Sequence, residues 1–255
     1  MSEIPSPDRR DFLAASAAML VAGPAAFAAA ARRSMEHGPG DSGDLAFGMV
    51  TYLWGRDLSL PELLTACRDA GLDGVELRTT HAHGVERTLG DDARREIRRR
   101  LADSPVRIVG LGSDERFDSP DPARLAAAKE ATLEFLELSA SIGGRGVKVK
   151  PDSFHVGVDR QRTIDQIGRS LGELAPAAAD LGQELRLEVH GQCADPAIIK
   201  RIMEIADHPA VVVCWNSNPR DLRGRGFRRH YDLLRPHFGG TVHVRELGGH
   251  ALSVC

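Results

Sequence analysis

Residues 185–191 read Leu-Arg-Leu-Glu-Val-His-Gly, an alternation of apolar and polar side chains that predicts a strand. Because strand side chains point to opposite faces in turn, Arg186, Glu188 and His190 share one face, and the apolar residues between them share the other. Strands of an ordinary parallel sheet are covered by helices on both faces and are apolar throughout. A charged face therefore needs a polar place to point, and the mouth of a closed barrel is such a place.

The same alternation recurs in four further segments of the chain. They are residues 75–78, 147–150, 211–218 and 242–246. If the strands are parallel and closed into a ring, the polar faces converge on one pocket at the carboxyl ends of the strands, where (β/α)₈ barrels carry their active sites. The alternative is a set of edge strands with one solvated face each. Edge strands are few in any sheet, so the pattern favours the barrel.

From residue 45 onward, apolar strand-like runs alternate with helical patterns, which is typical of repeated βα units. The predicted strands are 46–53, 73–78, 107–112, 147–150, 185–191, 211–216 and 241–246, and the predicted helices are 60–70, 91–102, 122–141, 163–181, 196–206 and one within 221–238. Pro176 is expected to interrupt the fourth helix. The pattern predicts an α/β fold of the (β/α)₈ TIM-barrel type.

The strand count predicts an incomplete barrel over residues 45–255, with seven strands and no eighth βα unit. The sequence ends at Cys255, shortly after the seventh predicted strand. Without an eighth strand the first and seventh strands would have exposed edges, and such edges favour association between copies of the chain.

The N-terminal residues resemble a twin-arginine (Tat) export signal. Arg9 and Arg10 precede Phe12, Leu13 and an alanine-rich apolar run. We expect residues 1–31 to be a cleaved signal peptide, residues 32–44 to be a linker, and the mature protein to be periplasmic with no stable membrane span. Without such a signal the protein would be cytoplasmic.

Composition excludes strong general attraction to nucleic acid or to an anionic membrane. The formal net charge is −3 at pH 7 and the isoelectric point is about 6.4. Partners must therefore be inferred from local features, and nucleic acid is not expected among them. The four cysteines show no CxxC spacing that would indicate a metal site.

Several ordered segments carry a resemblance to a known family. They are Gly-Met-Val-Thr-Tyr-Leu-Trp-Gly at 48–55, Gly-Val-Glu-Leu-Arg-Thr-Thr-His at 74–81, Gly-Val-Lys-Val-Lys-Pro at 146–151, Glu-Val-His-Gly at 188–191, Cys-Trp-Asn-Ser-Asn at 214–218 and Val-His-Val-Arg-Glu at 242–246. Together they resemble the xylose isomerase-like TIM barrels, the family of sugar phosphate isomerases and epimerases. This resemblance implies a divalent metal ion (Mn, Mg, Co or Zn) held at the strand ends by Glu, Asp, His and Glu.

The metal ligands implied by the resemblance are only partly present. Glu188 and His243 match two of them, Asn216 stands where the family has Asp, and the fourth ligand has no counterpart in this chain. An amide in place of a carboxylate removes a charge that would offset the metal, so weakened metal binding is expected.

Glu188 is the expected catalytic residue, because proton abstraction next to a carbonyl needs a carboxylate base close to the carbon and a positive charge close to the oxygen. A Glu on a strand face can equally be paired with a neighbouring Lys148 or Arg186. The expected substrate-binding residues are Glu76, Arg78, His81, Lys148, Lys150, His190, Asn218, Arg245 and Glu246.

Three functions are compatible with these residues. The first is a metal-assisted sugar isomerase or epimerase, whose activity the incomplete ligand set puts in doubt. The second is a non-catalytic relative that binds a sugar or another anion, which Asn216 favours. The third is a metal-dependent phosphodiesterase resembling the abasic-site endonucleases, which the acidic overall charge disfavours.

Overall fold

In the part of the chain that the structure describes, seven parallel strands alternate with helices, and each strand pairs with its neighbours in sequence, in the order β1-β2-β3-β4-β5-β6-β7. The computed structural model describes residues 46–217, 219–224 and 226–244. The strands are β1 (Gly48–Val50), β2 (Gly74–Arg78), β3 (Arg107–Arg116), β4 (Gly146–Lys150), β5 (Glu184–Glu188), β6 (Val211–Asn216) and β7 (Phe238–His243). The fold is therefore of the (β/α)₈ TIM-barrel type, as the alternation of strands and helices predicts.

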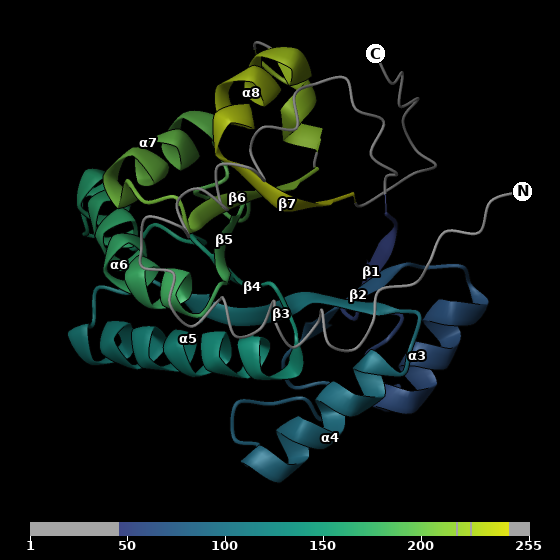
Figure 1. The fold of residues 1–255 in the computed structure, drawn as a ribbon. Coiled ribbons are helices and arrows are strands. Elements are labelled where there is room, and N and C mark those ends of the chain that lie inside the picture. Colours follow the sequence, from purple (N-terminus) through teal and green to yellow (C-terminus); the bar gives the residue numbers. More distant parts are fainter. Residues whose placement is uncertain (1–45, 218, 225, 245–255) are drawn as a thin grey trace, which may run out of the picture. The chain divides into compact units, whose positions relative to one another are not determined.

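The helices lie on the outside of the curved sheet (Figure 1). They are α3 (Leu60–Asp69), α4 (Asp91–Ala102), α5 (Pro122–Ile142), α6 (Arg160–Asp180), α7 (Pro196–Ala206) and α8 (Gly226–Leu234), with 3₁₀ turns η1 (Pro219–Leu222) and η2 (Arg235–His237). Among the described residues, no helix combines the length and apolar character that crossing a membrane requires. The predicted signal peptide, residues 1–31, and the predicted linker, residues 32–44, lie outside the described residues.

N-cap residues mark the first turns of α3, α5 and α7. The backbone N–H of Ser59 donates to the Glu62 carboxylate at 2.8 Å, which satisfies a donor at the start of α3. The Asp121 and Asp195 side chains accept from the backbone N–H groups two residues further on, at 2.9 and 2.8 Å, and a proline follows each aspartate.

Two predicted helices, α4 and α7, and one predicted strand, β6, have the predicted boundaries. β1 is shorter than predicted, and β7 begins and ends three residues earlier than predicted. The expected interruption at Pro176 is wrong, because α6 continues through it. Leu174, Ala175 and Ala178 are buried on both sides of the proline, and this packing holds the helix together despite the lost hydrogen bond.

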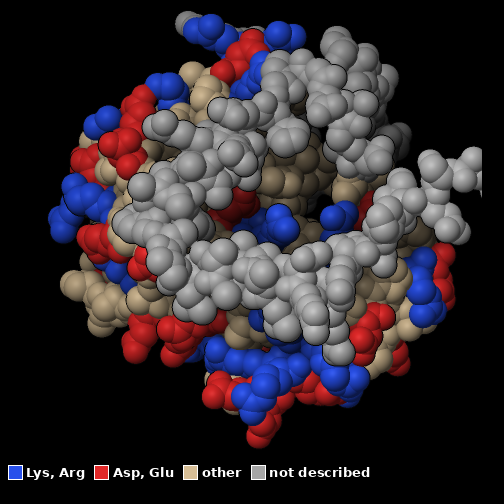
Figure 2. Space-filling model, viewed as in Figure 1, with Lys and Arg blue, Asp and Glu red and all other residues tan. Residues whose placement is uncertain are grey.

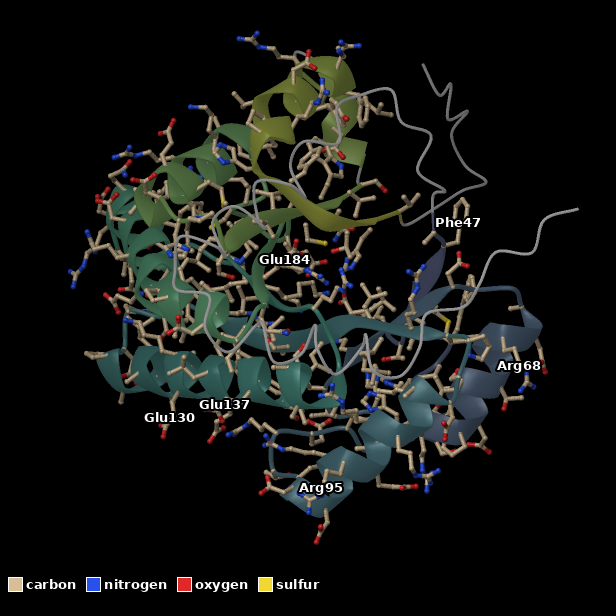
Figure 3. The ribbon with its side chains drawn as sticks, viewed as in Figure 1. Phe47, Arg68, Arg95, Glu130, Glu137 and Glu184 are labelled. Carbon is tan, nitrogen blue, oxygen red and sulfur yellow. The ribbon has the colours of Figure 1, made fainter. Side chains whose placement is uncertain are left out.

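The alternation of the strands separates an outer apolar face from an inner charged face. Val147, Val149 and Leu185 are fully buried in the hydrophobic core. The polar residues between them are also buried, since Lys148 is only 4% exposed and Arg186 only 3%. Figure 3 shows Glu184 inside the curve of the strands, whereas the labelled side chains of α3, α4 and α5 point away from the sheet.

Glycines make room for the charged side chains of the inner face. A Cβ on Gly146 would lie 2.7 Å from Arg186 Nε, and a Cβ on Gly112 would lie 2.8 Å from Glu76 Oε1. Such distances are shorter than van der Waals contact, so the missing side chains create the space that Arg186 and Glu76 occupy. The interior is thereby filled in layers, as in other barrels of this type.

Among the described residues, β1 pairs with β2 alone and β7 pairs with β6 alone. Val242 and Val244, at the end of β7, are about half exposed. Association of chains through these edges stays a prediction.

The Gly112→Ala substitution tests the layered packing. The added methyl would collide with Glu76 and lie 3.6 Å from Lys148 Cε, so we expect a loss of about 1–3 kcal/mol in the free energy of unfolding, typical of overpacking. Urea denaturation measures it. Gly90→Ala is the control, because a Cβ there has nothing within 4 Å; an equal loss in both variants would contradict the packing argument.

Candidate functional site

Five polar side chains from five strands meet at the carboxyl ends of the sheet. We call them the inner cluster: Glu76 of β2, Lys148 of β4, Glu188 of β5, Asn216 of β6 and His243 of β7. Each is at or within two residues of the last residue of its strand. The alternation of the five sequence segments indicates this convergence, and the structure confirms it.

Lys148 lies between the two carboxylates of the inner cluster. Its Nζ is 3.3 Å from Glu76 Oε1 and 3.2 Å from Glu188 Oε2. All three side chains are at most 6% exposed, so the two ion pairs are screened little by solvent. Glu188 is thus paired with Lys148, while Arg186 pairs with Glu184 at 2.7 Å.

His243 forms a second bridge between the same carboxylates. Its Nε2 lies 3.1 Å from Glu76 Oε2, and its Nδ1 lies 3.4 Å from Glu188 Oε1. Burial alone lowers the pKa of His243, but hydrogen bonds with Cys214, Glu188 and Glu76 outweigh it and raise the pKa to about 12. The ring is therefore cationic, with both nitrogens acting as donors.

The two carboxylates remain ionised despite their burial. Burial raises the pKa of Glu188, but the His243 hydrogen bond and the Lys148 charge outweigh it and lower the pKa to about 2. The pKa of Glu76 is held well below its usual range because Lys148 and His243 outweigh the same burial effect. The four charged groups of the cluster therefore carry two negative and two positive charges, which balance.

Asn216 completes the inner cluster as a neutral group. Its Nδ2 donates to Glu188 Oε1 at 2.8 Å, and the residue is 8% exposed. Glu188 therefore contacts Asn216, Lys148 and His243 at once, which fixes the orientation of its carboxylate.

A second group of charged side chains surrounds Asp114, further toward the carboxyl ends of the strands than the inner cluster. The Asp114 carboxylate contacts Lys150 Nζ at 2.6 Å, Arg78 Nη2 at 2.9 Å and Arg116 Nη2 at 3.2 Å. Arg78 and Lys150 follow Glu76 and Lys148 by two residues on the same strand faces, so they lie one layer further toward the carboxyl ends.

Asp152 extends this group toward β5. Its carboxylate pairs with both Arg116 and His190 Nδ1. We call the six residues the rim network: Arg78, Asp114, Arg116, Lys150, Asp152 and His190. Figure 2 shows a hollow in which Lys and Arg atoms lie beside Asp and Glu atoms.

Sequence reasoning missed Asp114, Arg116 and Asp152. Asp114 and Arg116 alternate at the end of β3, which extends four residues beyond the predicted strand, and Asp152 follows directly after β4 in the Pro151-Asp152 pair. A search for charged residues just beyond each predicted strand would have found them.

The remaining predicted site residues lie in other places. His81 is 9% exposed, and its Nδ1 lies 3.0 Å from Thr51 Oγ1. Burial lowers the pKa of His81, which favours the neutral ring. Asn218, Arg245 and Glu246 lie outside the described residues. The assigned roles of all predicted site residues stay predictions.

The inner cluster does not fit a divalent metal ion as it is arranged. The ammonium of Lys148 lies against one oxygen of each carboxylate, and both nitrogens of His243 face carboxylates rather than an open position. Within residues 46–217, 219–224 and 226–244, no three His, Cys, Asp or Glu side chains are grouped so that they could hold a metal. A metal would need Lys148 to move and His243 to lose a proton.

A parallel α/β barrel fold with charged residues at its carboxyl rim defines the class of protein. The xylose isomerase-like TIM barrel family matches residues 64–217, and the chain belongs to this family. No curated protein sequence matches the chain.

Solved structures share the fold at low sequence identity. A D-psicose 3-epimerase with D-fructose matches with a TM-score of 0.68 and 18% identity over 79% of this chain and 73% of the other. The 3-keto-D-glucoside 4-epimerase YcjR from E. coli matches with 0.66 and 16% over 79% of each chain. The IolI protein with a bound zinc atom matches with 0.61 and 15% over 78% of this chain and 88% of the other.

The Asp152→Asn substitution tests the rim network through acid stability. Burial raises the pKa of Asp152, but hydrogen bonds from His190 and Arg116 outweigh it and lower the pKa to about 2. Since the unfolded value is about 3.9, the carboxylate stabilises the fold fully above about pH 4, and this contribution disappears as the pH falls through about 2. Urea midpoints should therefore differ between wild type and variant at pH 7, and the difference should shrink near pH 3.

The exposed Asp180→Asn variant is the control for this measurement and should keep the wild-type pH profile. A difference between Asp152→Asn and wild type that is the same at both pH values would show that the ionised carboxylate contributes nothing to stability.

Proposed function

We propose that this chain is a sugar isomerase- or epimerase-like protein, which binds a small sugar at the inner cluster and moves a proton on the carbon next to its carbonyl. The observation that carries the proposal is the arrangement of Glu76 and Glu188, two buried carboxylates on either side of a buried cation at the carboxyl ends of the strands. Its position is where barrels of this type bind their substrates. The epimerases among the structural neighbours support the substrate class by analogy of fold.

The proposed chemistry needs an ionised base and a positive charge close to the oxygen that becomes an enolate. Glu188, with its pKa lowered to about 2, is ionised throughout the physiological range. The same low pKa makes it a weak base while it is paired with Lys148. A sugar oxygen that takes over a Lys148 hydrogen bond would weaken this pairing and raise the basicity of Glu188 in the complex.

The rim network favours a hydroxyl-rich or anionic ligand. Arg78, Arg116 and Lys150 contribute three positive charges, against two negative charges from Asp114 and Asp152. The excess positive charge and the many hydrogen-bond donors disfavour a cationic ligand and suit a sugar or sugar acid.

Binding without turnover is the second candidate function, and the pairing of Glu188 with Lys148 at 3.2 Å is the observation that favours it. If no sugar displaces Lys148 from Glu188, the carboxylate stays too weak a base to take a proton from carbon. The phosphodiester-cleaving alternative implies several metal ions held by His and acidic side chains, and no such grouping supports it among the described residues.

Deuterium exchange tests the proposal without knowledge of the product. We expect the chain to exchange the hydrogen next to the carbonyl of D-fructose, D-psicose, D-tagatose or L-ribulose in D₂O, measured by proton NMR. Glu188→Gln should abolish the exchange, since the amide keeps the shape but cannot accept the proton. Exposed Glu130→Gln is the matched control and should exchange at the wild-type rate.

Saturable sugar binding without exchange would establish the second candidate instead. If calorimetry detects no binding of any of the four sugars and no exchange occurs, both candidates fail for this substrate class.

A further inference from the structure

Two buried carboxylate oxygens of the inner cluster point at the same cation. Glu76 Oε1 and Glu188 Oε2 make no hydrogen bond of good geometry within the described part of the chain. Each instead faces Lys148 Nζ, at 3.3 and 3.2 Å. Buried oxygens in this situation need a positive charge beside them, and the lysine supplies it.

The surrounding residues accommodate the lysine at this position. Val147 and Val149 anchor the strand on its outer face, so the side chain of Lys148 must point inward. Gly112 of the neighbouring strand pairs with Lys148, and only the absence of a side chain there leaves room for the Glu76 carboxylate next to the lysine stem. The bridge is therefore supported by the packing of three strands.

Asn216 is matched to the lysine. A third carboxylate at this position would repel Glu188, whose Oε1 accepts a hydrogen bond from Asn216 at 2.8 Å. A neutral donor removes that repulsion. Lys148 and Asn216 together give the cluster a cation and an amide where the family resemblance implies a carboxylate.

We propose that the ammonium of Lys148 takes the place of a divalent metal ion, so that the site binds and polarises its sugar without metal. The polarising role rests on the proposed function, whereas the absence of metal binding does not. In the proton-transfer step the C–H bond next to the carbonyl breaks and its proton passes to Glu188. The electron pair forms the enolate, whose oxygen accepts a hydrogen bond from Lys148, and Glu188 returns the proton to carbon.

The ammonium of Lys148 carries three N–H donors, and two of them face the carboxylates of Glu76 and Glu188. In the proposed complex the third donates to a sugar oxygen. A metal bound to the same carboxylates would lie close to the ammonium, and the repulsion between like charges in a buried site would weaken its binding.

The test is titration of the full chain, after dialysis against EDTA, with Mn²⁺ and with Zn²⁺ by calorimetry. We expect no stoichiometric site in the wild type. Lys148→Met combined with Asn216→Asp should bind Mn²⁺ at least about tenfold more tightly, because the competing cation is gone and a carboxylate is added. Lys129→Met is the matched control in this titration, because its ammonium pairs with Glu173 outside the inner cluster and the rim network, and it should bind metal as the wild type does.

The wild-type titration decides the inference even if the double variant fails to fold. One tightly bound Mn²⁺ or Zn²⁺ per chain that Glu188→Gln removes would overturn it. Sugar exchange that survives EDTA supports the polarising role of Lys148, and exchange lost in EDTA and restored by Mn²⁺ overturns it. Loss of all exchange under both conditions refutes the proposed function and with it the polarising role, while the metal titration still judges the absence of a metal site.

Discussion

The interior of this barrel depends on the balance of buried charges around Lys148. Glu76, Lys148, Glu188 and His243 come from four different strands, and His243 of β7 reaches Glu76 of β2 at 3.1 Å. Taking charges out of water is costly unless each finds an opposite partner, and removal of one partner of a buried pair typically costs about 3–5 kcal/mol. The curve of the sheet is thus tied to a set of contacts that no two neighbouring strands could make alone.

The same requirement organises the barrel from one end to the other. At the amino end of β5, Glu184 pairs with Arg186 at 2.7 Å, and Arg186 also donates to the carbonyl of Val109 at 3.2 Å. The inner cluster forms the next layer, and the rim network follows it. Each layer contains both positive and negative groups. Gly146 and Gly112 lie where a larger residue would collide with Arg186 and Glu76.

Membership of the xylose isomerase-like family establishes the barrel fold of this chain, but it does not establish which reaction the chain catalyses. The barrel is shared with epimerase structures at 18% identity or less, so the arrangement of strands persists while most side chains differ. A site of the same fold can use a metal ion or a protein cation to stabilise developing negative charge, since both supply a positive charge at a fixed point. In this chain the ammonium of Lys148 lies between two buried carboxylates, and our proposal gives it that role.

The sequence by itself determined the alternation of strands and helices and the face on which each strand residue lies. Val147 and Lys148 could be assigned to opposite faces because a strand has a side-chain period of two, and the caps Ser59, Asp121 and Asp195 act within a single turn. The continuation of α6 through Pro176 and the ends of β3 and β7 could not be predicted from the sequence, since packing against neighbouring elements decides whether a helix or strand continues.

Only the tertiary structure decided which charges meet. Alternation predicted that Glu188 and His243 point toward one pocket. It did not predict that Lys148 pairs with Glu188 while Arg186 pairs with Glu184, or that Asp114 contacts three cations. These pairings depend on the register and curvature of strands far apart in the chain. Distances of a few ångströms between distant residues follow from the register and curvature of the whole sheet, which no local pattern encodes.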